Sequence, residues 1–302
     1  MSTARSEFKP FTLAFVQLGR IGMNKEENLN HAREMILRAA SGEGHSKKPD
    51  LVVLPEYFNT PLGEAALPDW AEDIEFEPGR PYDATSSNSP SVKMLANAAK
   101  ETGTWIIGGS IPERSGQEDK PFNACTVYNP TGEMVARHRK LHLFDVDIPG
   151  GVTYKESDHV TPGSTMNYFD TDFARIGLGV CYDVRFPELA MVAARRGCQV
   201  VIYPALFSVA TGQMHWEILQ KSRAVDNQVF MGMCSPARNN EAKLPAYGYS
   251  TVVDPTGKIL VQAGEDEEVI YADIDPAVFE SARSGIPVTT QRRFDVYKNV
   301  AD

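Results

Sequence analysis

The sequence lacks any long apolar run, and it has no excess of basic residues. A membrane-spanning helix needs about 20 consecutive apolar residues, and no stretch comes near that length. The formal net charge of −10 is spread along the 302 residues, which argues against nucleic acid as the main partner. The start, MSTARSEFKPFTLAFVQLGR, lacks the basic region and small-residue cleavage site of a secretory signal. We therefore expect a cytoplasmic protein that binds neither membrane nor nucleic acid, although a mitochondrial location is compatible with the same features.

Cysteine and histidine are scarce, and neither occurs at the spacing of a ligand pair. The four cysteines lie far apart and form no CxxC pair, so we expect them to be reduced. His138 and His142 are four residues apart, but within a predicted strand and loop, where we expect no metal. There is no Walker or Rossmann glycine loop and no GxSxG serine elbow. We expect neither a metal nor another cofactor.

Two halves of the chain repeat one order of elements, in which strands and helices alternate and a hairpin follows. The hairpin turns are Asn129–Gly132 and Asp254–Gly257, each with Pro-Thr-Gly after the first residue. The first half is predicted to contain strand 11–18, helix 26–40, strand 50–55, helix 91–101, strand 104–112 and hairpin 124–140. The second half is predicted to contain strand 174–181, helix 187–197, strand 199–204, helix 215–227, strand 229–237 and hairpin 250–264.

This pattern predicts an α/β fold with internal pseudo-symmetry, because each half supplies one mixed sheet with helices on one face. The other faces of the two sheets then pack together, which gives a four-layer α-β-β-α sandwich. No Pro/Ser-rich linker separates the halves. We therefore expect a single domain over residues 11–285 and a C-terminal extension over residues 286–302.

Three predicted strands end in residues able to do chemistry, and α/β proteins tend to place their sites at such ends. Glu56 follows strand 50–55; it is either a solvated acid or, where buried, a carboxyl with a raised pKa that moves protons. Lys140 follows basic residues and precedes apolar ones; it is either part of a solvated face or a desolvated ammonium that stabilises an oxyanion.

Cys181 ends the third of these strands, in the stretch RIGLGVCYDVRFPEL. Pro187 and Glu188 mark a helix start soon after it, so the cysteine lies on a strand-to-helix turn of the kind that exposes a nucleophile. The alternative is core filling, the role that we expect for Cys125, Cys198 and Cys234. The order acid, lysine, cysteine, each at a strand end, favours a catalytic site.

The segments LPEYFN, HRKLHLFDVDIPG and GVCYDVRFPELA resemble the three signature segments of the nitrilase superfamily of carbon–nitrogen hydrolases, and the similarity spans almost the whole chain. TGQMHWEILQKSRAVDNQVF and QRRFDVY resemble its omega-amidase branch in particular. The resemblance implies the four-layer nitrilase-like fold. It also implies hydrolysis of the terminal amide of 2-oxoglutaramate or 2-oxosuccinamate to the 2-oxo-dicarboxylate and ammonia, through a cysteine thioester. Members usually form homodimers, sometimes larger assemblies.

By position, the resemblance makes Glu56 the general base, Lys140 the oxyanion-stabilising lysine and Cys181 the nucleophile. The substrate-binding positions that it implies are Glu156, Tyr182, Arg185, Phe207 and Thr211. On the residues alone, the alternative for Glu156 is a loop acid, and the alternative for Arg185 is a surface arginine at a helix entry. The resemblance also implies a scaffold of buried polar contacts along one helix, made by Trp216, Arg223, Asp226 and Asn227.

Three positions depart from the family pattern. Leu62 removes a hydroxyl that relatives place near the pocket, and Tyr249 stands where close relatives tend to carry histidine. These departures bear on the identity of the substrate and not on the catalytic chemistry. Tyr57 replaces a frequent cysteine, and we expect it to be neutral for catalysis.

Other functions fit parts of the pattern. A related amidase, acting on deaminated glutathione or on an N-carbamoyl compound, has the same three catalytic groups. A papain-like protease needs a histidine base, for which His215 or His142 is the candidate. A non-enzymatic binding protein on this fold has no use for all three polar groups together.

Overall fold

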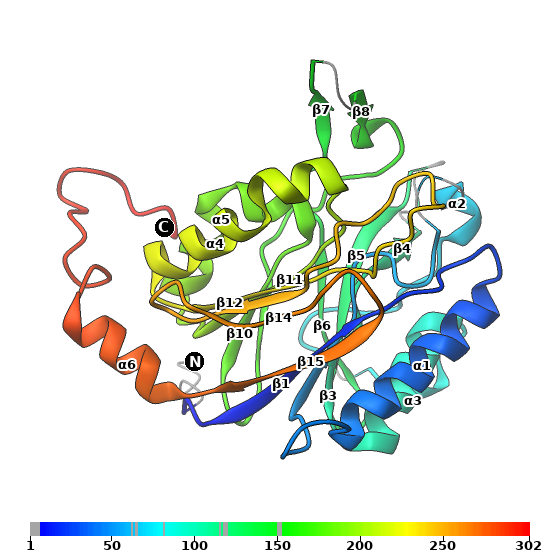
Figure 1. Cartoon of the computed structure of the whole chain (residues 1–302), viewed down its shortest axis with the longest axis horizontal. Coiled ribbons are helices and arrows are strands. Elements are labelled where there is room, and N and C mark those ends of the chain that lie inside the picture. Colours follow the sequence, from blue (N-terminus) through cyan, green and yellow to red (C-terminus); the bar gives the residue numbers. More distant parts are fainter. Residues whose placement is uncertain are drawn as a thin grey trace.

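The computed structural model describes residues 7–61, 63, 66–80, 82–114, 116, 120–149 and 153–302. Two mixed sheets lie face to face, and a pair of helices covers the outer face of each (Figure 1). The predicted four-layer α-β-β-α arrangement is therefore confirmed.

The first sheet has, within the described residues, the strand order β15-β1-β2-β3-β5-β4, with β6 paired to β5. Strands β1, β2 and β3 are parallel, and the other pairs are antiparallel. The bounds are β1 Phe11–Gln17, β2 Leu51–Val53, β3 Trp105–Ile107, β4 Ile111–Glu113, β5 Phe122–Tyr128, β6 Met134–Arg139 and β15 Glu268–Ile274.

The second sheet has the order β14-β13-β12-β11-β10-β9 over the part of the chain that is described. Its central strands β10, β11 and β12 are parallel, and the outer pairs are antiparallel. The bounds are β9 Tyr168–Asp170, β10 Arg175–Leu178, β11 Val200–Pro204, β12 Phe230–Cys234, β13 Thr251–Val253 and β14 Ile259–Gln262.

Helices α1 (Lys25–Ser41) and α3 (Pro90–Thr102) cover the first sheet, and α4 (Pro187–Arg195) and α5 (Val209–Asn227) cover the second (Figure 1). The two-stranded sheet of β7 (Asp145–Asp147) and β8 (Thr153–Lys155) projects from the body. The remaining elements are α2 Leu67–Trp70, α6 Pro276–Gly285 and 3-10 helices at Ala84–Ser86, Glu156–Asp158 and Cys181–Arg185.

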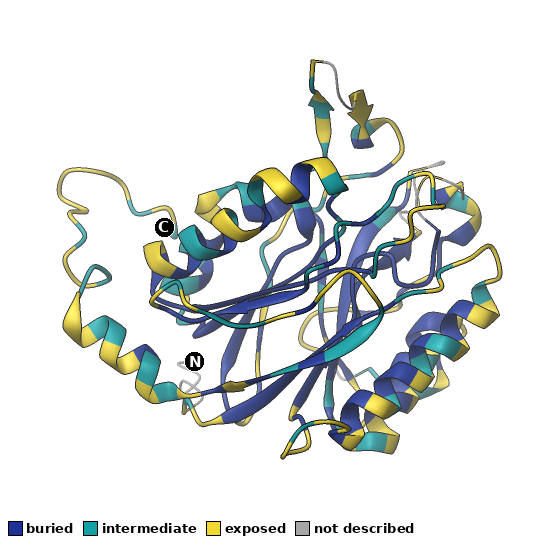
Figure 2. Cartoon of the chain, in the orientation of Figure 1, coloured by how far each residue is buried: buried dark blue, intermediate teal, exposed yellow. Residues whose placement is uncertain are grey.

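Strand β1 illustrates how the layers are held together. Its side chains alternate, so that Phe15 belongs to the core between the sheets while Ala14 and Val16 belong to the core under α1 and α3. The sheets approach closely here, since a Cβ built on Gly232 of β12 would lie 2.5 Å from the Phe15 ring. Both sheets are consequently buried along most of their length, as Figure 2 shows.

Two predicted strands, 174–181 and 229–237, end three residues early, at Leu178 and Cys234, and two other boundaries differ more. The predicted strand 104–112 is two strands, β3 and β4, because Gly109 turns the chain with a φ of +60° and a Cβ there would lie 2.1 Å from the carbonyl oxygen of Pro55. The predicted helix 215–227 begins earlier, at Val209, because Ser208 caps its first turn. Strand β15 and helix α6 lie outside the predicted pattern. No helix of the described residues is long and apolar enough to span a membrane.

Candidate active site

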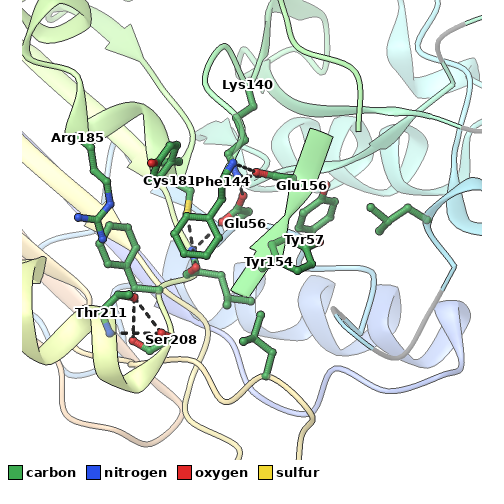
Figure 3. Close-up of a pocket in the computed structure, with 15 residues that line it drawn as sticks. Glu56, Tyr57, Lys140, Phe144, Tyr154, Glu156, Cys181, Arg185, Ser208 and Thr211 are labelled. Atoms are coloured by element: carbon green, nitrogen blue, oxygen red, sulfur yellow. Dashed lines mark hydrogen bonds and ion pairs between the residues drawn. The ribbon is translucent and has the colours of Figure 1, made fainter. Parts of the chain in front are cut away.

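A cavity of about 90 Å³ lies beyond the carboxyl ends of β2, β6, β10 and β11. Every predicted catalytic and substrate-binding residue lines it (Figure 3): Glu56, Lys140, Glu156, Cys181, Tyr182, Arg185, Phe207 and Thr211. Side chains distant in the sequence therefore meet here. The described residues that line the cavity include no histidine, so the site lacks the base of a papain-like protease.

Cys181 begins a 3-10 helix just after β10, with a backbone φ of +61°. Left-handed backbone is unfavourable for a residue with a side chain, and such strain tends to be kept at functional sites. The residue is 6% exposed, and its Sγ donates to the carbonyl oxygen of Leu206 at 3.5 Å. Burial and the charge of Glu56 raise the pKa of the thiol well above its ordinary value. A thiolate therefore requires a base that takes the proton.

Glu56 is the carboxyl that can accept the thiol proton, because it interacts with Cys181. Its Oε1 accepts hydrogen bonds from Asn123 Nδ2 at 2.7 Å and from Lys140 Nζ at 3.2 Å, and its Oε2 accepts from the backbone N–H of Leu206 at 2.8 Å. Burial raises the pKa of Glu56, and the charge of Lys140 opposes that rise. A carboxyl whose pKa is raised in this way is suited to take up a proton from the thiol and to release it again.

Lys140 lies between two carboxylates. Its Nζ is 2.9 Å from Oε1 of Glu156 and 3.2 Å from Oε1 of Glu56, and the residue is 2% exposed. Burial alone lowers the pKa of an ammonium, but the charges of Glu156 and Glu56 hold the pKa of Lys140 well above its ordinary value. The backbone N–H of Phe144 donates to the other oxygen of Glu156 at 2.6 Å. Lys140 is thus a fixed cation.

Arg185 occupies a different part of the cavity wall, at the end of the 3-10 helix that begins with Cys181. Its guanidinium lies over the rings of Phe207 and Tyr182, 4.8 Å and 5.7 Å from their centroids. Nη1 donates to Nδ1 of His215 at 3.0 Å, and no carboxylate of the described residues forms an ion pair with it. Burial lowers the pKa of Arg185. The cavity therefore holds a cation without an acidic partner.

Together these groups can cleave an amide. A thiol with an adjacent proton acceptor supplies an activated nucleophile, and a fixed ammonium stabilises the oxyanion that its attack creates. The first N–H groups of a 3-10 turn have no acceptor within the turn, so the backbone N–H of Tyr182 is available to the same oxyanion.

Sequence reasoning missed two polar residues that hold the site. Asn123, on β5, donates to Glu56, and its only signal is an amide in a mostly apolar strand. Asp183 is fully buried and contacts the segment that carries Lys140. Its signal is an acid two residues after Cys181, in a stretch predicted only as a turn.

The scaffold prediction holds in part. Trp216 Nε1 donates to the carbonyl oxygen of Tyr249 at 2.7 Å, and Arg223 Nε donates to that of Val184 at 3.0 Å. Asn227 Nδ2 donates to the carbonyl oxygen of Arg223 at 2.9 Å. The prediction is wrong for Asp226. Its side chain is 57% exposed, and its distance of 3.9 Å from the Arg223 guanidinium is too long for a hydrogen bond.

The positions that depart from the family pattern differ in their relation to the cavity. Tyr249 lies outside it and donates through its hydroxyl to Glu265 Oε1 at 3.1 Å. Tyr57 lines the cavity with a φ of +51°, and its buried hydroxyl has no hydrogen-bond partner among the described residues. Leu62 lies outside the described residues. The other cysteines, Cys125, Cys198 and Cys234, are buried in the core as expected.

Comparison with known proteins identifies the family. The family described as Carbon-nitrogen hydrolase matches residues 12–284. Omega-amidase NIT3 of Saccharomyces cerevisiae is 45% identical over 99% of both chains, and Omega-amidase NIT2 of Homo sapiens is 44% identical over 95% of this chain and 96% of its own. The crystal structure of Saccharomyces cerevisiae Nit3, titled a member of branch 10 of the nitrilase superfamily, superimposes with a TM-score of 0.84 and 42% identity over 97% of this chain and 100% of that one. The chain belongs to the carbon–nitrogen hydrolase family.

Proposed function

We propose that this protein is an omega-amidase that hydrolyses the terminal amide of 2-oxoglutaramate and 2-oxosuccinamate. The observation that carries the proposal is that one small cavity holds both the groups around Cys181 and the Arg185 guanidinium, which has no carboxylate partner among the described residues. A dicarboxylate monoamide has an amide at one end and a carboxylate at the other, which matches that pairing. The relatives named Omega-amidase support the same substrate class.

Acylation begins when the Cys181 thiol gives its proton to Glu56 as the sulfur attacks the amide carbon. The carbonyl oxygen becomes an oxyanion, which Lys140 and the backbone N–H of Tyr182 stabilise. Glu56 then passes the proton to the amide nitrogen. The carbon–nitrogen bond breaks, ammonia leaves, and the acyl group remains on Cys181 as a thioester.

Deacylation uses the same groups in the same order. Glu56 takes a proton from water, and the resulting hydroxide attacks the thioester carbon. The oxyanion forms again beside Lys140 and collapses with release of the sulfur, which recovers its proton from Glu56. One carboxyl thus serves both half-reactions, for which its raised pKa suits it.

Substrate orientation is proposed to depend on the part of the cavity wall that carries Arg185. A guanidinium binds a carboxylate through two parallel hydrogen bonds, so Arg185 is proposed to hold the distal carboxylate. The Thr211 hydroxyl, fixed by Ser208 Oγ at 2.9 Å, lies on the same wall. Phe207 packs under the guanidinium and limits the directions in which it can point.

The test is a substrate panel scored by ammonia release, with 2-oxoglutaramate, deaminated glutathione and an N-carbamoyl amino acid. We expect the highest kcat/KM for 2-oxoglutaramate. A clear preference for either of the other compounds would replace the proposed substrate with that of a related amidase. The absence of ammonia release from all three would contradict the proposed function.

We also propose a homodimer formed through the helical face of the second sheet. Helix α5 exposes Met214, Ile218 and Val225, which are 59%, 60% and 48% exposed and recur at helical spacing on one side. Residues 286–302, the proposed C-terminal extension, add Ile286 and Val296, also exposed. Sedimentation at a dimer mass is expected, whereas a monomer at micromolar concentration would exclude it. The cytoplasmic location stays a prediction, which cell fractionation tests.

A further inference from the structure

Asp183 lies two residues after Cys181, and it takes no part in the mechanism above. Its carboxylate is completely buried and does not line the cavity. Oδ2 accepts hydrogen bonds from the backbone N–H of Val180 at 3.0 Å and from His138 Nε2 at 3.1 Å. Oδ1 accepts from the backbone N–H of His142 at 2.9 Å and from its ring Nδ1 at 2.8 Å.

These donors come from two distant parts of the chain. Val180 immediately precedes Cys181, whereas His138 and His142 stand two residues before and two residues after Lys140. The carboxylate therefore joins the turn that carries the thiol to the segment that carries the ammonium. The backbone N–H of Leu141 adds a longer contact to Oδ2, at 3.4 Å.

The carboxylate is strongly held in its ionised form. Burial alone raises the pKa of an acid, but the hydrogen bonds from His138 and His142 outweigh burial and hold the pKa of Asp183 well below its ordinary value. Leaving a buried anion without such donors costs free energy, so the groups that contact it resist displacement. The ring of His142 is fixed a second time, by stacking on Phe186 with centroids 3.7 Å apart.

We propose that Asp183, His138 and His142 form a positioning unit that sets the place of Cys181 relative to Lys140. The Cys181 backbone, with its φ of +61°, needs such support, because a residue with a side chain relaxes from this conformation when it is free to do so. Displacement of a reacting group by about 1 Å can cost about 100-fold in rate. None of the three residues lines the cavity, so loss of the unit should lower kcat and leave KM nearly unchanged.

The two histidines allow matched substitutions, which separate the loss of a hydrogen-bond donor from the loss of the imidazole ring itself. Asparagine places a donor where His142 has Nδ1, and glutamine places one where His138 has Nε2, whereas leucine removes the donor at either site. We would compare His142→Asn with His142→Leu and His138→Gln with His138→Leu. His45→Leu, at a histidine that does not line the cavity, controls for the loss of an imidazole. His142 is the safer site, because its side chain is already 32% exposed.

The measurement is kcat and KM for ammonia release from 2-oxoglutaramate, with the thermal unfolding midpoint of each variant recorded. We expect kcat to fall between about 10-fold and about 100-fold in the leucine variants, with KM within about twofold, and to recover most of the loss in His142→Asn and His138→Gln. The inference would be overturned if the folded His142→Leu variant kept its kcat, or if the asparagine and glutamine variants lost as much as the leucine ones.

The inference rests on the proposed role of Cys181, but the two can fail separately. If the unmodified protein releases no ammonia, the proposed function fails. The same variants are then compared by the rate at which iodoacetamide alkylates Cys181. A slower rate in the leucine variants, restored in the matched ones, supports the positioning unit, and equal rates in all of them refute it.

Discussion

The Nζ atom of Lys140 lies 2.9 Å from Oε1 of Glu156, and it lies only slightly farther from Glu56. One buried ammonium is thus shared by two carboxylates, and the charge of Glu156 contributes to the raised pKa of Glu56. Glu156 therefore acts on both of the other groups. It anchors the cation that is proposed to stabilise the oxyanion, and its charge raises the pKa of the carboxyl that is proposed to accept the proton.

The pH dependence of activity should report this coupling. Glu56 accepts the thiol proton only when it is ionised, so kcat/KM falls as the pH is lowered through its pKa, which lies above the ordinary 4.5. Replacing Glu156 by Gln removes a negative charge that raises this pKa. We expect the acid limb of the Glu156→Gln profile to move to lower pH. A limb that stays in place or moves upward would contradict the coupling.

Lys140→Met removes the cation while keeping the length of the side chain. Loss of one oxyanion donor costs about 100-fold to about 1,000-fold in kcat in comparable enzymes. We expect at least the lower figure, with a smaller change in KM, because the positive charge matters most when the oxyanion forms. Steady-state ammonia release measures the effect, and Lys100→Met, at an exposed lysine of α3, is the matched control. A kcat within about tenfold of the unmodified protein would argue against this role.

Arg185→Leu should act on binding rather than chemistry. Hydrogen bonds to a charged group contribute about 1.5–3 kcal/mol, which corresponds to a factor of about 10 to about 150 in kcat/KM. We expect the loss to appear mainly in KM for 2-oxoglutaramate. Arg185→Lys keeps the charge but loses the two-pronged geometry, so its KM should lie between that of the unmodified protein and that of Arg185→Leu. An unchanged KM in Arg185→Leu would contradict the proposal that Arg185 binds the distal carboxylate of the substrate.

The sequence predicted the layers because the fold depends on periodicity. Strand β1 alternates between two cores, and the buried strands β2 and β11 appear as short apolar runs. Such patterns could not predict the break between β3 and β4. It depends on the close approach of Gly109 to the Pro55 carbonyl, a contact between residues far apart in the chain. Strand β15 pairs with β1 across almost the whole sequence, which no local pattern reveals.

The predicted site residues share one cavity, but their supports were not predicted. Glu56, Lys140 and Cys181 each have a local signal at a strand end, whereas Asn123 and Asp183 matter only through what they contact in the fold. His138 and His142, for which the sequence indicated no structural partner, bind the same buried carboxylate. A single sequence gives little indication of polar contacts between segments that are distant in the chain.

The most direct test of the account is the mass of the enzyme after acid quenching during turnover of 2-oxoglutaramate. We predict an acyl adduct that peptide mapping places on Cys181, absent from Cys198, whose pKa burial raises to about 12, and absent from the Cys181→Ala variant, which should release no ammonia. Continued ammonia release by Cys181→Ala, or an adduct on another residue, would contradict the claim that this thiol carries the reaction.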